Sequence, residues 1–211
     1  YAVNDKSSIK ASYNRMVQNT HLITNGTIPV PFNTWNPSGY YLKPQIADQV
    51  ALGYFRNLND HNIELSAEAF YKELQDVTEF ADNANVFFNK DLAVEFRQGQ
   101  STAYGIEFLA EKTEGKFTGF ASYTLSKVTR TVPGVNQGKA YLANYDRRHV
   151  FNAAATYEFS SKWTFGATFT YSSGRPITVP SGRYEFEDYN VDMITERNAY
   201  KLAPIHRLDL S

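Results

Sequence analysis

The segment Trp163–Ser172 reads WTFGATFTYS, and its residue types alternate along its whole length. One set of alternate positions holds Trp, Phe, Ala, Phe and Tyr, while the other holds Thr, Gly, Thr, Thr and Ser. A period of two is typical of a β-strand with one apolar and one polar face. A tilted strand needs about 9–11 residues to cross a bilayer. The segment therefore predicts a strand long enough to span a membrane.

The same alternation recurs on both sides of this segment. Residues 151–159 repeat it, and only residues 160–162 separate the two stretches, so we expect a hairpin there. Further stretches lie upstream, and a last one starts at Arg207. The sequence thus predicts about eight antiparallel strands, at 9–13, 50–54, 63–71, 104–110, 117–125, 151–159, 163–172 and 207–210.

The connectors between these strands fall into two classes that alternate along the chain. The short connectors are 57–61, 112–116 and 160–162, and the long ones are 18–45, 75–100, 130–147 and 173–205. In an antiparallel sheet this order places all long loops at one end. Short turns at one end and long loops at the other are typical of outer-membrane β-barrels.

Composition excludes several classes of protein. The 211 residues carry 21 Lys and Arg against 22 Asp and Glu, and contain no cysteine. There is no basic excess to neutralise nucleic-acid phosphates, and disulfides, thiolate metal sites and cysteine nucleophiles are excluded. A mean hydropathy of −0.46 suits a soluble protein. A transmembrane barrel also averages low, because only every second residue faces lipid.

The main structural alternative is a soluble β-sandwich or a lipocalin-like barrel, which would also alternate. The predicted polar faces carry mostly Thr, Ser, Gly and Asn, whereas a solvated sheet carries many Lys and Glu. Four unstructured connectors of this length are improbable in a compact soluble domain. Aromatic residues also gather near strand ends, as in interfacial girdles. These features favour the membrane barrel; the residues concerned are Tyr54, Tyr71, Tyr104, Phe117, Phe151, Phe159, Trp163 and Tyr171.

Catalytic and metal-binding motifs are weak. None of the four histidines has the spacing of a zinc motif, so we expect no metal site. The run 146–149, Asp-Arg-Arg-His, suggests a rim hydrolase through His149, but we interpret it as a strand start whose charges pair with neighbouring strands. Glu107 and Glu111 lie about 13 Å apart along one strand, too far for a carboxylate pair. We therefore predict no enzyme activity and no cofactor.

The long loops hold the plausible ligand chemistry. Their aromatic rings are able to stack on a chelate or a sugar ring, although the same rings also pack loops together. The candidate ligand-binding residues are Trp35, Tyr40, Tyr41, Tyr141, Tyr184, Phe186 and Tyr189, and Phe87, Phe88 and Tyr145 lie in the same loops.

Seven motifs in order resemble one family. They are 41–45 (YLKPQ) with 50–55 (VALGYF), 104–107 (YGIE), 122–126 (SYTLS), 145–149 (YDRRH), 171–176 (YSSGRP) and 206–209 (HRLD). Their order and spacing over essentially the whole chain resemble the C-terminal part of the barrel of TonB-dependent receptors, particularly the Bacteroidetes kind.

This resemblance implies a barrel of about 22 strands with a plugged lumen. In such receptors a plug domain binds ligand together with the extracellular loops, and TonB pulls on it with energy from ExbB and ExbD. Residues 1–211 contain no plug, no TonB box and no complete terminal strand. Eight strands alone would leave two unpaired edges, so we expect a portion of a longer polypeptide.

The function that follows is a receptor in the outer membrane of a Gram-negative bacterium, importing a siderophore, vitamin or oligosaccharide. Its expected partners are the TonB–ExbB–ExbD system, outer-membrane lipid and lipopolysaccharide, a small-molecule or glycan ligand and a surface lipoprotein. The alternative is a small eight-stranded barrel with a structural or adhesive role.

Overall fold

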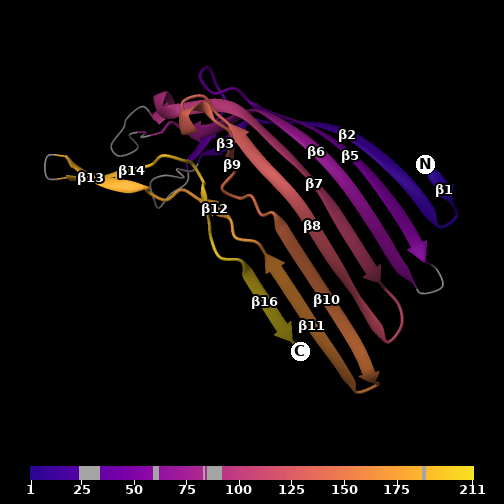
Figure 1. Cartoon of the computed structure of the whole chain (residues 1–211). Coiled ribbons are helices and arrows are strands. Elements are labelled where there is room, and N and C mark those ends of the chain that lie inside the picture. The colour runs from indigo at the N-terminus through magenta and orange to yellow at the C-terminus, as the bar shows by residue number, and fades with distance from the viewer. Residues whose placement is uncertain (24–33, 59–61, 83, 85–91, 187–188) are drawn as a thin grey trace.

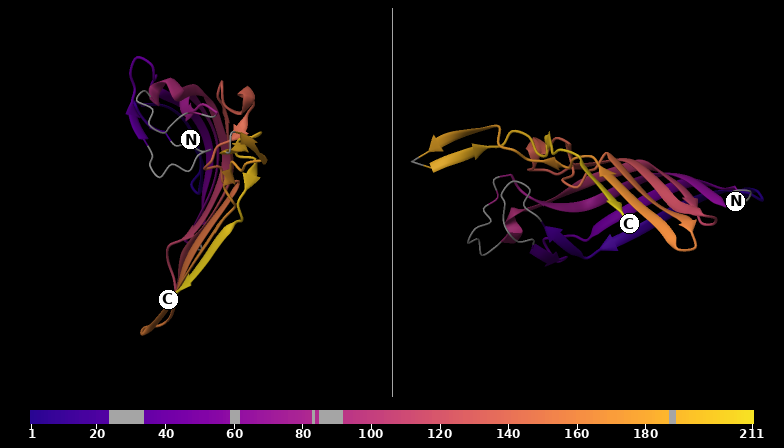
Figure 2. Two further views of the ribbon diagram at one scale, coloured as in Figure 1. Left: turned by 90° about the vertical axis from the view of Figure 1, so that its left-hand side faces the viewer. Right: turned by 90° about the horizontal axis from the view of Figure 1, so that it is seen from below.

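The computed structural model describes residues 1–211 except 24–33, 59–61, 83, 85–91 and 187–188. Its main feature is one antiparallel sheet in the order β1-β2-β5-β6-β7-β8-β10-β11-β16, with β9 paired to β8. The sheet is curved and open, and β1 and β16 form its two edges (Figures 1 and 2). This confirms the predicted all-β, antiparallel architecture.

Eight long or terminal strands make up the body of the sheet. They are β2 (Ser7–Gln18), β5 (Gln45–Leu58), β6 (Ile63–Phe80), β7 (Phe96–Lys112), β8 (Phe117–Thr131), β10 (His149–Ser160), β11 (Trp163–Ser172) and β16 (Ile205–Leu210). Each contains one of the eight predicted stretches or most of it. The predicted turns at 112–116 and 160–162 are confirmed to within about two residues, while residues 59–61 of the first turn lie outside the described residues.

The long connectors contain strands of their own, so the expectation of unstructured loops is wrong. The first holds the hairpin β3 (Thr20–Ile23) and β4 (Thr34–Pro37). The second begins only after Phe80 because β6 and β7 run beyond the predicted ends, and it includes the 3₁₀ turn η1 (Leu92–Glu95). The remaining elements are β1 (Ala2–Asn4), η2 (Asn136–Gly138), β9 (Tyr141–Leu142), β12 (Pro176–Ile177), β13 (Gly182–Phe186), β14 (Tyr189–Met193) and β15 (Tyr200–Lys201).

The strand register aligns the alternating patterns across the whole sheet. Ala153 pairs with both Ala121 and Phe169, and Phe169 pairs with Leu208, so apolar positions face apolar positions from strand to strand. We call this side the apolar face; it includes Tyr13, Leu52, Tyr71, Tyr104, Phe108, Tyr123, Phe151, Phe165, Phe169 and Leu208. The opposite side, the polar face, includes Ser12, Glu68, Glu107, Thr124, Asn152, Thr168 and Asp209.

The buried apolar core lies at the long-loop end and not under the sheet. Val77, Val132, Val135 and Tyr141 form one buried cluster, and Ile23, Phe80, Ala81 and Ala84 form another. On the apolar face, by contrast, Leu52, Phe108 and Phe165 are all exposed. The loop end is therefore packed, while the wall itself presents apolar side chains with no protein layer against them. No helix among the described residues is long and apolar enough to cross a membrane.

Candidate functional site

The long loops meet at one buried side chain, Arg197. Its guanidinium Nε donates to Asp82 Oδ1 at 3.0 Å, and Nη2 donates to the carbonyl of Phe80 at 3.1 Å. Arg197 belongs to the connector between β11 and β16 and is 4% exposed, whereas Phe80 and Asp82 lie at the end of β6. A buried guanidinium is stable only when its donors are paired. The ion pair therefore ties two loops that are distant in sequence into one body.

A third loop joins the same cluster through Asn136. The Asn136 backbone N–H donates to Asp82 Oδ2 at 2.6 Å, and its side-chain carbonyl accepts from the Arg197 backbone N–H at 2.9 Å. Asn136, Gln137 and Gly138 adopt positive φ angles of 52°, 57° and 74°. Residues with side chains, and Gln more than Asn, rarely take this conformation, so the tertiary contacts hold the turn in place.

Tyr141 is the buried aromatic residue at the centre of this cluster. It is 6% exposed, and its hydroxyl has no hydrogen-bond partner among the described residues. Burial raises the pKa of this hydroxyl, and the nearby Glu79 carboxylate raises it further. Tyr141 therefore stays protonated at physiological pH and is available as a hydrogen-bond donor.

A second ion pair lies beneath the loops. Arg130, near the end of β8, pairs with Glu79 of β6, and its guanidinium also stacks 5.3 Å from the ring of Tyr145. Both charged side chains are largely buried. This pair fixes the upper ends of β6 and β8 relative to the loop that follows β8.

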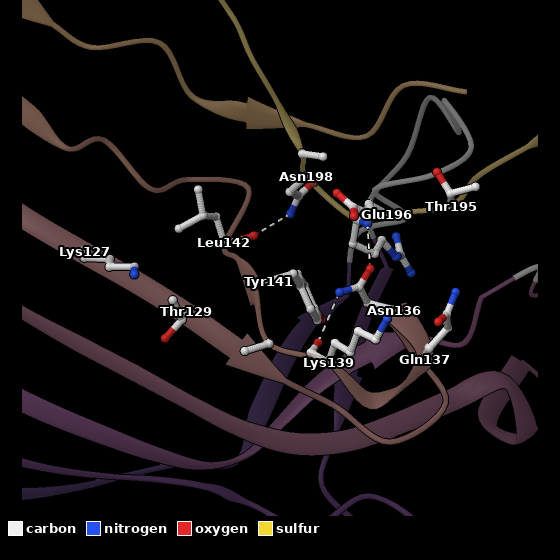
Figure 3. Close-up of a pocket in the computed structure, with 13 residues that line it drawn as sticks. Lys127, Thr129, Asn136, Gln137, Lys139, Tyr141, Leu142, Thr195, Glu196 and Asn198 are labelled. Atoms are coloured by element: carbon white, nitrogen blue, oxygen red, sulfur yellow. Dashed lines mark hydrogen bonds between the residues drawn. The ribbon is translucent and has the colours of Figure 1, made fainter. Parts of the chain in front are cut away.

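A cavity of about 540 Å³ opens between the end of β8, residues 136–142 and residues 195–199. Figure 3 shows the Asn198–Leu142 and Asn136–Lys139 hydrogen bonds on two sides of Tyr141, and Lys127 and Thr129 on β8. Its size falls within the range of small-molecule sites. The cavity walls come from three separate segments, so it exists only when the loops are assembled.

The structure separates the aromatic ligand candidates instead of gathering them. Tyr40 and Tyr41 form an exposed edge-to-face pair with centroids 4.9 Å apart, and Trp35 is exposed on β4. Tyr184 is exposed on β13, whereas Tyr141 is buried. The side chains of Phe186 and Tyr189, and residues Phe87 and Phe88, lie outside the described part of the structure. These residues remain predictions as ligand contacts.

The hydrolase interpretation gains no support from His149. Its Nδ1 lies 2.8 Å from the hydroxyl of Tyr123, and both residues are on the apolar face. Asp146 is buried and accepts from the backbone N–H of Val128 at 2.7 Å, and Arg147 donates to Ser172 Oγ at 2.8 Å. The run 146–149 thus precedes and starts β10, but its polar groups pair with backbone and hydroxyl groups and not with opposite charges. No group of three potential metal ligands occurs among the described residues.

The polar face carries a charge pattern that the sequence did not reveal. Glu64 lies directly opposite Glu111, and Glu68 lies directly opposite Glu107, in the β6–β7 register. Directly opposite residues have Cβ atoms about 4.5–5.5 Å apart, and like charges in this arrangement repel. The predicted separation along one strand was correct but irrelevant, because these carboxylates approach across strands. A long loop joins β6 to β7, so no turn length specified their register.

The chain matches, over residues 1–211, the sequence profile of a family described as TonB dependent receptor-like, beta-barrel. Among curated proteins none matches the chain. Solved structures with the same fold include the ferripyoverdine receptor FpvA of Pseudomonas aeruginosa (14% identity, TM-score 0.67) and the ferric-catecholate receptor Fiu of Escherichia coli K12 (16%, 0.62). The FrpB iron transporter of Neisseria meningitidis is a third (14%, 0.60).

All of the chain aligns with these structures, but it spans only 25%, 27% and 30% of their respective lengths. At such identities the likeness concerns the fold alone. The matches are to the family as a whole and do not single out the Bacteroidetes kind.

Proposed function

Because the chain belongs to the TonB-dependent receptor β-barrel family, we propose that it is the C-terminal part of the barrel of an active transporter. The complete protein would import a scarce nutrient, such as a siderophore, a vitamin or an oligosaccharide, across the outer membrane of a Gram-negative bacterium. The observation that carries this proposal is the family match over residues 1–211, together with a wall whose apolar face has no protein layer against it.

Placement in a membrane accounts for the apolar face. On β6, apolar positions run from Ile63 to Tyr71 and end at Glu73, which accepts a 2.9 Å hydrogen bond from the Tyr71 hydroxyl. Tyr13 likewise donates to Asp48 at 2.6 Å. A nine-residue apolar row topped by tyrosines that reach polar groups fits a tilted strand in the hydrocarbon core with its girdle at the interface.

The loop asymmetry supports an orientation. Turns of two to four residues join the strands at one end, and the long, packed loops lie at the other. In outer-membrane barrels the short turns face the periplasm. We therefore place the Arg197 cluster on the extracellular side.

The polar face supports a plugged lumen. Two opposed carboxylate pairs, Glu64 with Glu111 and Glu68 with Glu107, need compensating positive charge when water is excluded. A plug domain inside a larger barrel would supply such groups, and further strands would pair with the edges at β1 and β16. Coupling to TonB, ExbB and ExbD would then act through that plug.

Iron chelates are the first ligand class to test. The names of the three solved receptors above refer to a ferripyoverdine, a ferric catecholate and iron. The aromatic loop residues Trp35, Tyr40, Tyr41 and Tyr184 are exposed and suit stacking on a chelate or a sugar.

The test begins with an antibody to residues 34–45, used on native outer-membrane fractions. We expect a heat-modifiable band several times heavier than 24 kDa, and energy-dependent uptake of labelled nutrient that disappears when TonB is deleted. A heat-modifiable band near 24 kDa would instead support the small structural or adhesive barrel. Uptake that persists without TonB would refute active transport.

A further inference from the structure

We propose that the cavity between β8, residues 136–142 and residues 195–199 binds the phosphate group of an outer-leaflet lipid, with Lys127 and Lys139 as its cationic ligands. The inference rests on the proposed function, because it requires the apolar face to lie in the outer membrane. It goes beyond transport by assigning a site for a lipid headgroup on the barrel wall.

The position of Lys127 in the register is the first argument. It follows Leu125 by two residues on β8 and lies directly opposite Tyr104 of β7, so it continues the apolar face past the tyrosine girdle. Two strand residues rise about 6.6 Å, or about 5 Å along the membrane normal at a tilt of about 45°. A cation at this height meets the phosphate layer of the lipid headgroups.

The second argument is the charge state of the cavity. The ammonium groups of Lys127 and Lys139 have no ion-pair or hydrogen-bond partner within the described residues, although both residues line the cavity. Arg197 also lines it, but Asp82 and the Phe80 carbonyl already engage its guanidinium. Glu196 contributes one carboxylate against these two unpaired cations. The lining therefore favours an anion.

The third argument is that the walls are held in place before any ligand arrives. Asn136 Nδ2 donates to the Lys139 carbonyl at 3.2 Å, and Asn198 Nδ2 donates to the Leu142 carbonyl at 2.7 Å. The left-handed turn at 136–138 is fixed by Asp82 and by the Arg197 backbone. A preorganised site loses less entropy when it binds.

The face on which Lys127 lies distinguishes a lipid from the transported nutrient. Lys127 and Thr129 share their side of β8 with Leu125, and Leu142 lies opposite Thr129. This side is opposite to the polar face that would line the lumen. A nutrient on its way to the lumen does not cross this wall, whereas a membrane lipid adjoins it permanently.

The experiment uses the full-length receptor purified from outer membranes in detergent. Binding of lipid A is compared with binding of the same lipid after enzymatic removal of its phosphates. We expect the Lys127→Gln/Lys139→Gln double variant to bind phosphorylated lipid A about tenfold more weakly, because two charge-assisted contacts are lost. The dephosphorylated lipid should bind wild type and variant equally weakly. Lys162→Gln, in the exposed turn between β10 and β11, is the matched control and should bind like wild type.

Each other outcome overturns the proposal. Equal binding of phosphorylated lipid to wild type and double variant would remove the assigned ligands. Displacement of the lipid by millimolar inorganic phosphate alone would identify a free-anion site. If the double variant fails to show a heat-modifiable band, Lys139→Gln, in an exposed loop, gives the same test. Normal TonB-dependent uptake with unchanged lipid binding would overturn this inference alone, whereas absence of the protein from the outer membrane would overturn the proposed function.

Discussion

Single residues at the loop end determine how the extracellular surface is assembled. Arg197 contacts Asp82 and Phe80, which precede it by 115 and 117 positions, and its backbone contacts Asn136, which precedes it by 61. Tyr141 and Tyr40 are both loop tyrosines, yet they are 6% and 94% exposed. Residue type therefore did not separate a core aromatic from a surface aromatic; only the contacts did.

Replacement of Arg197 by Met should release the loop that joins β11 to β16. Each buried acceptor left without its donor costs about 1–3 kcal/mol. We expect proteinase K to cleave residues 173–205 about tenfold faster on intact cells, since 1.4 kcal/mol is a factor of ten. Lys201→Met, at an exposed position of the same loop, is the control and should leave the cleavage rate unchanged. Equal cleavage of Arg197→Met and wild type would contradict the role of the ion pair.

His21 should make the β3–β4 hairpin sensitive to acid. Its ring nitrogens lie 3.1 Å from Ser38 Oγ and 3.3 Å from Thr78 Oγ1, and burial lowers its pKa below the usual 6.5. The unfolded chain therefore takes up the proton at higher pH than the folded chain. The stability that depends on neutral His21 is present above pH 6.5 and is lost as the pH falls through the lowered pKa.

Hydrogen exchange of residues 20–23 and 34–37 measures this effect. Exchange corrected for its intrinsic pH dependence should speed up between pH 7.5 and pH 5. In His21→Gln, which has no titrating ring, protection should not change over this interval. A pH dependence that survives in the variant would assign the effect to another group.

At the scale of elements, the strands place neighbouring residues in opposite environments. Thr168 lies opposite Asp209 on the polar face, while Phe169 lies opposite Leu208 on the apolar face. Adjacent positions on β11 therefore test the facing of the entire wall, because the register carries the same phase from strand to strand.

Phe169→Arg should be far less tolerated than Thr168→Arg. An arginine near the bilayer midplane costs about 2–4 kcal/mol, whereas an arginine at 168 gains Asp209 as a cross-strand partner. The measurement is the heat-modifiable fraction of the full-length receptor after refolding into lipid vesicles. Equal yields from the two variants would show that the assignment of the lipid-facing side is incorrect.

At the scale of the whole molecule, the sheet is a wall and not a closed container. β1 and β16 lie at opposite edges of the strand order, and the buried clusters lie only at the loop end. Unpaired backbone groups at both edges are not tolerated within hydrocarbon. The wall therefore needs further strands for closure, and the opposed glutamates need a partner in the lumen.

Residues 1–211 expressed alone should not form a stable barrel. Refolding into lipid vesicles should give aggregated or protease-sensitive material without a heat-modifiable band, because the edges pair between chains. The full-length receptor, refolded under the same conditions, is the control. A monomeric, heat-modifiable, protease-resistant product from residues 1–211 would favour the small closed barrel.

The sequence by itself determined the properties that depend on neighbouring residues. The alternation in 151–159 and 163–172, the lengths of the turns and the order of the family motifs are local, because side chains alternate along a strand wherever that strand lies. They predicted eight strands, the apolar and polar faces, the loop asymmetry and the family.

Only the tertiary structure decided which distant residues meet. The opposed pairs Glu64–Glu111 and Glu68–Glu107 depend on a register set across a long loop, and the Arg197 cluster depends on three loops packing together. The cavity beside Lys127 has the same origin. Such contacts result from burial and hydrogen bonding summed over segments far apart in the chain, and no pattern of adjacent residues encodes them.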